Sequence, residues 1–162
     1  MNSVVCSTSV PQLPQGAVDS HFHLFGPQSR YPYVAHRQYT PDDAGLGAYM
    51  AMAAKLGIAR AVIVQPSPYG TDNRRLLDGM ADCPLDVRGV VAVAPDVNEA
   101  ELLAMQGLGV CGIRINLVFD ATAAVQTAIR LAPLLREIGW HIQFLVDVST
   151  WPDIAATVRQ LG

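Results

Sequence analysis

The sequence is poor in charge, in cysteine and in long apolar runs. Charged residues make up 15% of its 162 residues, the formal net charge is −3, and no basic run is present, so we expect no nucleic-acid partner. No apolar run reaches the roughly 18 residues of a membrane span, so we expect no membrane partner. The three cysteines lack metal-ligand spacing, and an odd number fits a reducing cytoplasm.

Two further absences narrow the chemistry. The sequence has no glycine-rich phosphate loop and no strained turn around a nucleophilic serine. Residues 1–17 lack the basic start and long apolar segment of a signal peptide, and we interpret them as an irregular lead-in. Apolar residues make up 51% of the chain, enough for a folded core, so we interpret residues 18–162 as one domain.

Compact apolar runs alternate with helical patterns along that domain. Strands are predicted from Val18 and over 61–65, 87–93, 110–115 and 142–146, and helices over 43–56, 72–80, 96–106, 122–138 and from Thr150 onward. This alternation favours a parallel sheet built from right-handed strand–helix–strand units. Two architectures contain such a sheet: an open doubly wound sheet and part of an eight-stranded barrel.

Polar residues near the carboxyl ends of the strands favour the barrel. Arg114 and Asn116 share one face of the fourth strand, whose other face is apolar, and Gln143 lies on the polar face of the fifth. Gln65 ends the second strand. In a barrel these ends meet at one mouth, where ligands bind, and we predict that Gln143 contacts the substrate there. We therefore predict an α/β fold of the (β/α)8 TIM-barrel type, of which this chain holds the first five βα units.

A histidine pair ends the first predicted strand. His21 and His23 lie two residues apart, so both side chains point to the same face. Such a pair can ligate a metal, donate hydrogen bonds to a substrate carbonyl, or serve a structural role. We favour a functional role, because other strand ends bring polar groups to the same mouth.

Arg114 needs an anion, because a guanidinium facing a barrel interior is costly to leave unpaired. A protein carboxylate, Asp19 or Asp147, is one possible partner, and a substrate carboxylate is the one we favour. Asn116 fits either a ligand contact or a hydrogen bond within its loop. Tyr39, in a long aromatic loop, can hydrogen-bond a substrate.

A turn rich in proline and glycine, Gln65-Pro66-Ser67-Pro68-Tyr69-Gly70-Thr71-Asp72-Asn73, follows the second strand. We assign Gln65 and Ser67 to the site. Asp72 and Asn73 are interpreted as residues that shape the turn and cap the next helix. His36 is not expected to be catalytic.

Five segments together resemble the amidohydrolase superfamily, namely Asp19–Pro27, Tyr31–Tyr33, Arg37–Pro41, Val64–Asn73 and Gly112–Asn116. Within it they are most similar to the branch of 2-pyrone-4,6-dicarboxylate lactonase and related sugar-acid lactone enzymes. The resemblance implies a distorted (β/α)8 barrel that hydrolyses or isomerises the lactone of a carboxylated substrate. It also implies that His21 and His23 contact the lactone carbonyl, and that Tyr39, Ser67 and Arg114 hold the substrate.

Two positions depart from the pyrone lactonase pattern. Phe119-Asp120 occupies the region of its second arginine, and Leu145 stands where it has a tyrosine. Loss of a cation and a hydroxyl from the carboxylate sites argues against the pyrone dicarboxylate as substrate. The turn after the second strand is more similar to that of the sugar-lactone members.

A required metal is not expected. A zinc hydrolase needs about three protein ligands plus water, and the histidine pair supplies two. Metal-dependent superfamily members add a lysine or glutamate on strand four or a histidine on strand five, whereas strand four here ends in Arg114 and Asn116. A cation there would oppose a metal ion. The alternative is a zinc-dependent amidohydrolase or decarboxylase.

Five βα units reach residue 162, whereas a complete barrel has eight and typically about 250 residues. By the resemblance, an aspartate on the eighth strand is the expected general base, and it has no position in this sequence. We therefore expect the 162-residue chain alone to be inactive, and the free edges of its outer strands to favour oligomerisation. A third hypothesis is a non-catalytic half-barrel that binds ligands without turnover.

Overall fold

The computed structural model of the protein describes residues 13–118 and 121–161; most of the predicted lead-in and Phe119-Asp120 lie outside these ranges. One parallel sheet contains β1 (Val18–Phe22), β2 (Arg60–Val64), β3 (Asp86–Val91), β4 (Val110–Asn116) and β5 (His141–Leu145). Its order is β1-β2-β3-β4-β5, with all neighbours parallel. A doubly wound sheet reverses its order at a switch point, whereas a barrel does not. The predicted partial barrel is therefore confirmed.

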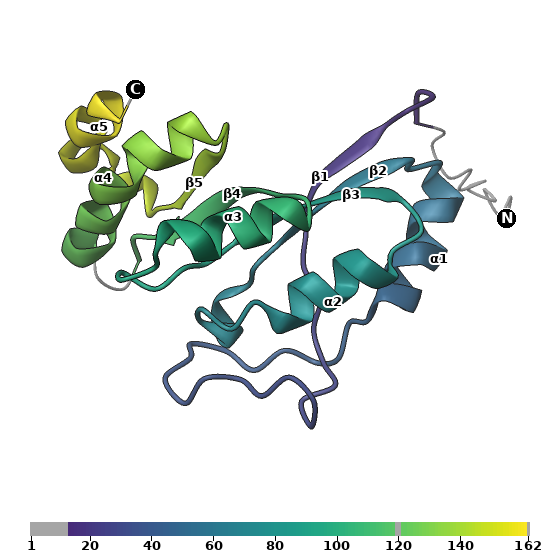
Figure 1. Ribbon diagram of the computed structural model, residues 1–162. Coiled ribbons are helices and arrows are strands. Elements are labelled where there is room, and N and C mark those ends of the chain that lie inside the picture. Colours follow the sequence, from purple (N-terminus) through teal and green to yellow (C-terminus); the bar gives the residue numbers. More distant parts are fainter. Residues whose placement is uncertain (1–12, 119–120, 162) are drawn as a thin grey trace, which may run out of the picture.

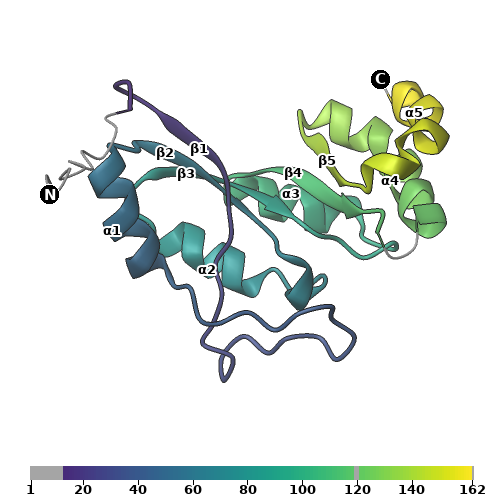
Figure 2. The same ribbon diagram turned by 180° about the vertical axis from the view of Figure 1, so that it is seen from behind.

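Five α-helices and two short 3-10 helices connect these strands. They are α1 (Leu46–Leu56), η1 (Ser67–Tyr69), α2 (Arg74–Asp82), α3 (Glu99–Gly107), α4 (Ala121–Glu137), η2 (Val148–Thr150) and α5 (Trp151–Gln160). Figure 1 and Figure 2 show α1, α2 and α3 along one face of a curved sheet, with α4 and α5 beside β5. In the described ranges, no helix has both the length and the apolar character needed to cross a bilayer.

Alternation along β4 separates the core from the polar face. Ile113 and Ile115 are buried in the core formed by sheet and helices, and each contributes roughly 1.5–3 kcal/mol through burial. Arg114, between them, points to the opposite face because successive side chains of a strand alternate. On β4 the core therefore lies on the helix side of the sheet, and the opposite face carries Arg114.

The first helix begins later than predicted. The sequence pattern places its start at Asp43, but α1 begins at Leu46. Ala44 instead forms an antiparallel bridge with Phe25, with hydrogen bonds of 2.9 and 3.1 Å between the two backbones. Pairing with a distant segment therefore keeps this stretch extended, and the local helix propensity does not decide it.

The third helix also begins later than predicted. Asp96 is not its cap: α3 begins at Glu99, and Asn98 is the N-cap. The Asn98 side chain accepts from the Glu101 N–H, and the Glu101 carboxylate accepts from the Asn98 N–H, both at 3.0 Å. This reciprocal capping box satisfies two helix-end donors, which a lone aspartate would not do.

Candidate active site

The two histidines at the end of β1 face each other. Their Nε2 atoms lie 3.4 Å apart, and their rings meet edge to face with centroids 4.9 Å apart. The Nδ1 atom of His23 is 2.7 Å from the carbonyl oxygen of Val64 at the end of β2. A carbonyl only accepts, so Nδ1 of His23 carries the ring proton and Nε2 keeps its lone pair. Two adjacent strands thus fix this ring.

Arg114 lies next to the pair. Its Nη1 atom is 3.5 Å from Nε2 of His23 and 3.4 Å from the carbonyl oxygen of Gln65. Within the described residues no carboxylate forms an ion pair with it. Partial burial lowers the pKa of Arg114 below its usual value, and the hydroxyl of Tyr39 partly opposes this shift. The guanidinium is thus half-buried next to neutral groups, as expected for a cation that takes an anionic ligand.

The two proposed protein partners of Arg114 are engaged elsewhere. Asp19 accepts hydrogen bonds from the hydroxyl of Tyr49 at 3.1 Å and from the N–H of His21 at 3.1 Å. Asp147 accepts from the backbone and hydroxyl of Ser149. The alternative of a structural ion pair with either carboxylate is therefore not realised.

Gln143 contacts His21 on the side of the imidazole ring that faces away from His23. Gln143 lies on β5 and pairs in register with Arg114 on β4. Its Nε2 atom lies 3.1 Å from Nδ1 of His21. The structure thus brings these groups into one series of neighbouring contacts, which runs from Gln143 through His21, His23 and Arg114 to the carbonyl of Gln65. These groups come from β1, β2, β4 and β5 or from residues that directly follow them, and the predicted convergence of polar groups from separate strands is present in the structure.

The side chain of Gln65 is used mainly within the turn that follows it. It is 1% exposed, and its Nε2 donates to the carbonyls of Gly70 at 3.3 Å and Asp72 at 2.8 Å. Alternation puts Gln65 on the face of Ala61 and Ile63, which belong to the core. Gln65 therefore holds the turn in place while its carbonyl faces Arg114.

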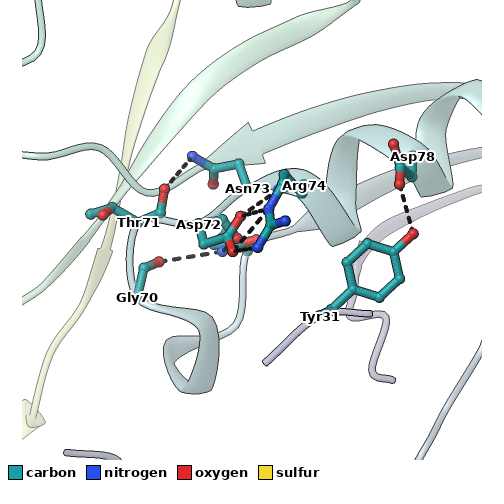
Figure 3. Close-up of polar contacts among 8 residues, drawn as sticks. Tyr31, Gly70, Thr71, Asp72, Asn73, Arg74 and Asp78 are labelled. Atoms are coloured by element: carbon teal, nitrogen blue, oxygen red, sulfur yellow. Dashed lines mark hydrogen bonds and ion pairs between the residues drawn. The ribbon is translucent and has the colours of Figure 1, made fainter. Parts of the chain in front are cut away.

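Asp72 and Asn73 shape the same turn, as predicted (Figure 3), but Asn73, the N-cap of α2, makes no side-chain capping hydrogen bond. The carboxylate of Asp72 accepts from the backbone N–H and the guanidinium of Arg74. Asn73 donates to the carbonyls of Thr71 at 3.1 Å and Ala92 at 2.7 Å, and accepts from the N–H of Ala92 at 3.1 Å. These two hydrogen bonds to the backbone of Ala92 tie the turn to the segment after β3 and fix one wall of the site.

The aromatic loop between β1 and α1 packs against this turn. The N–H of Gly26 donates to the hydroxyl of Tyr69 at 2.8 Å, and the rings of Tyr33 and Tyr69 lie 4.9 Å apart. The hydroxyl of Tyr31 donates to Asp78 on α2 at 2.7 Å (Figure 3). Tyr31 and Tyr69 thus serve packing, whereas Tyr39 in the same loop stays 46% exposed.

A cavity of about 380 Å³ opens beside Arg114, between the ends of β2, β3 and β4 and the first turns of α4. This volume suits a small ligand. Four predicted site residues line it, namely Gln65, Ser67, Arg114 and Asn116. Most of the remaining lining is apolar, and the histidine pair adjoins the cavity through Arg114.

Three polar residues of the lining, His36, Thr71 and Thr127, were not predicted as site residues. His36 is not expected to be catalytic and Thr71 belongs to the predicted turn, yet both line the cavity, together with Thr127 of α4. Their sequence neighbourhood carries no signal for this, because the long loop and the turn meet only in the folded chain. Asn116, which was predicted, also accepts from the N–H of Val118 at 2.9 Å, so it contributes both to its loop and to the cavity.

We predict that His21 and His23 both titrate below pH 6.5. Burial lowers the pKa of each imidazole, and the positive charge of Arg114 lowers both further. Unfolded imidazoles bind protons more readily, so the free energy of unfolding should fall as the pH drops below about 6.5. NMR titration of the ring signals measures both midpoints. Arg114→Gln should move both upward, and midpoints at or above 6.5 in the unaltered chain contradict the prediction.

The sequence profile of the amidohydrolase family matches residues 18–161. The chain is 36% identical over 151 residues to the 2-pyrone-4,6-dicarboxylate hydrolase of Comamonas testosteroni, covering 90% of this chain and 49% of that protein. It is 40% identical over 152 residues to the 4-sulfomuconolactone hydrolase of Hydrogenophaga intermedia, covering 92% and 50%. The chain belongs to the amidohydrolase family.

The fold is similar to that of a solved relative. A candidate 2-pyrone-4,6-dicarboxylic acid hydrolase from Pseudomonas putida aligns with a TM-score of 0.75 and 35% identity, over 93% of this chain and 55% of that one. The chain spans about half the length of the curated relatives it matches. The polar strand ends described above therefore belong to part of an amidohydrolase-family barrel.

Proposed function

We propose that this chain supplies the histidine–arginine part of an enzyme that hydrolyses a carboxylated lactone. The observation that carries the proposal is the position of Arg114, which lies between a neutral imidazole and a cavity of about 380 Å³ without a carboxylate partner among the described residues. The relatives, named as hydrolases of a pyrone dicarboxylate and a sulfomuconolactone, support the substrate class. Isomerisation of such a lactone is the alternative reaction.

The predicted histidines, Arg114 and the predicted pocket residues have distinct roles in this proposal. Arg114 holds the carboxylate of the substrate, and His21 and His23 lie at the lactone carbonyl group, where neutral His23 can accept but not donate through Nε2. In hydrolysis, water adds to that carbonyl, its oxygen gains negative charge, and the ring C–O bond then breaks to give a hydroxy acid. Donors placed at that oxygen lower the barrier because they stabilise the developing charge. Tyr39, Ser67, Asn116 and the buried Gln65 contact or shape the remainder of the substrate pocket.

We propose further that the reaction needs no metal. In the described residues, no three side chains of His, Cys, Asp or Glu gather as a metal site, and the Arg114 cation 3.5 Å from Nε2 of His23 would repel a metal ion there. Elemental analysis of the purified chain should find less than one zinc per ten chains. Incubation with a chelator should leave lactone binding unchanged. Stoichiometric zinc, or binding restored only by zinc, would favour the zinc-dependent alternative.

The proposed partner is a small anionic molecule rather than nucleic acid or a membrane. The open edges of β1 and β5 offer backbone groups for association with a further chain, so oligomerisation is part of the proposal. Cys83 and Cys111 are free thiols, in keeping with a cytoplasmic location.

A binding titration tests the proposal without requiring turnover. Muconolactone, which carries one carboxylate, is compared with its neutral methyl ester by calorimetry with the 162-residue chain. The carboxylate should bind about tenfold or more tightly than the ester, because charge-assisted hydrogen bonds contribute roughly 1.5–3 kcal/mol. Equal affinity for acid and ester, or no binding of either, would overturn the proposed substrate class.

A further inference from the structure

Gln143 contacts the histidine pair, through His21, but does not line the cavity. Its Nε2 atom lies 3.1 Å from Nδ1 of His21, and its Oε1 atom is buried without a partner among the described residues. A side-chain amide can present either its NH2 group or its oxygen to a neighbour. One amide atom stays unpaired in either orientation, so the choice between them depends on His21.

The ring protons of His21 and His23 determine which orientation of the Gln143 amide allows every facing atom a hydrogen bond. The carbonyl of Val64 places the ring proton of His23 on Nδ1, so Nε2 of His23 is an acceptor. The facing Nε2 of His21, at 3.4 Å, makes a hydrogen bond only if it carries a proton. In a neutral ring Nδ1 of His21 is then an acceptor, which requires the NH2 group of Gln143.

The other orientation produces a conflict. If Oε1 of Gln143 faced Nδ1 of His21, that nitrogen would carry the proton. The Nε2 lone pairs of His21 and His23 would then face each other at 3.4 Å without a proton between them. Such a pair of converging lone pairs suits a bound cation, yet the guanidinium of Arg114 already occupies the adjoining position.

We propose that Gln143 is a positioning residue that keeps the ring proton of His21 on Nε2. His21 is then a hydrogen-bond donor and His23 an acceptor at the same mouth. On the proposed function, on which this consequence rests, the Nε2–H of His21 donates to His23 in the free chain and to the lactone carbonyl once substrate is bound. Nε2 of His23 is then free to accept a proton from the attacking water. The predicted role of Gln143 as a direct substrate contact is thereby replaced by one exerted through His21.

Two-bond 1H–15N spectra of the chain, labelled at histidine, test this without any substrate. At a pH of about 8 the imidazoles are neutral, and the spectra show which ring nitrogen is protonated. We expect the proton on Nε2 in His21 and on Nδ1 in His23. In Gln143→Glu the carboxylate only accepts, so the proton of His21 should move to Nδ1 while that of His23 stays.

Gln106→Glu is the matched control, because the amide of Gln106 donates to the carbonyl of Ile138, away from the site. Its histidine spectra should equal those of the unaltered chain. A proton on Nδ1 of His21 in the unaltered chain overturns the proposal, even if the Gln143→Glu variant does not fold. A folded variant that keeps the proton on Nε2 also overturns it. Failure of lactone binding alone would overturn only the proposed function.

Discussion

Replacing Arg114 with glutamine should weaken muconolactone binding by roughly 10- to 100-fold and leave binding of the methyl ester unchanged. The expected loss follows from the roughly 1.5–3 kcal/mol that hydrogen bonds to charged groups contribute. Arg114→Lys should recover part of the affinity, because lysine restores the charge but lacks the planar fork that holds a carboxylate with two bonds. Isothermal titration calorimetry with both ligands measures these differences.

The same variant should not destabilise the fold. Burial already lowers the pKa of Arg114, and no ion pair within the described residues offsets its lost hydration. Thermal unfolding of Arg114→Gln should therefore occur at the same temperature or higher. The control is Arg88→Gln, since Arg88 pairs with Asp86 on the exposed start of β3. Equal loss of affinity in both variants, or a strong loss of stability at Arg114, contradicts a ligand-binding role.

The largest loss of stability is expected for Ile113→Ala. Ile113 is 0% exposed in the core, adjacent to Arg114 and on the opposite face of β4. Removing its side chain loses transfer free energy and leaves a cavity, which together cost about 2–5 kcal/mol. Domains are stable by only about 5–15 kcal/mol, so this is a large fraction. Urea unfolding at constant pH measures the difference.

Two further variants bracket that result. Ile113→Val removes one methyl group and should cost about 0.5–1.5 kcal/mol. Ile129→Ala repeats the isoleucine-to-alanine change at a residue of α4 that is 41% exposed. Surface substitutions of this kind change the free energy of unfolding by no more than about 0.5 kcal/mol. A loss at Ile113 no greater than at Ile129 would mean that β4 is not held by its helix side.

Alternation along the strands made much of the fold and site predictable. The period of two in β4 places Ile113 in the core and Arg114 with Asn116 on the polar face, and the cavity lining agrees. The spacing of His21 and His23 likewise predicts rings on one side, and the structure brings them to 3.4 Å. These features depend on residues close in sequence, for which the geometry of a strand is sufficient.

Contacts between distant segments set the limits of that reasoning. The bridge between Phe25 and Ala44 delays α1, and nothing near Ala44 in the sequence indicates it. The use of Gln65 within its own turn depends on the backbone path to Gly70. The Asn98–Glu101 capping box, by contrast, has a recognisable spacing and could have been found from the sequence.

The central claim is that the histidine pair and Arg114 bind one anionic lactone together. The most direct measurement is an NMR titration of the chain with muconolactone, followed at the ring nitrogens of His21 and His23 and at the Nε–H of Arg114. All three sets of signals should shift with a single dissociation constant, and the methyl ester should leave the Arg114 signal unmoved. Shifts at Arg114 with no change at the histidines, or equal shifts with the ester, would contradict it.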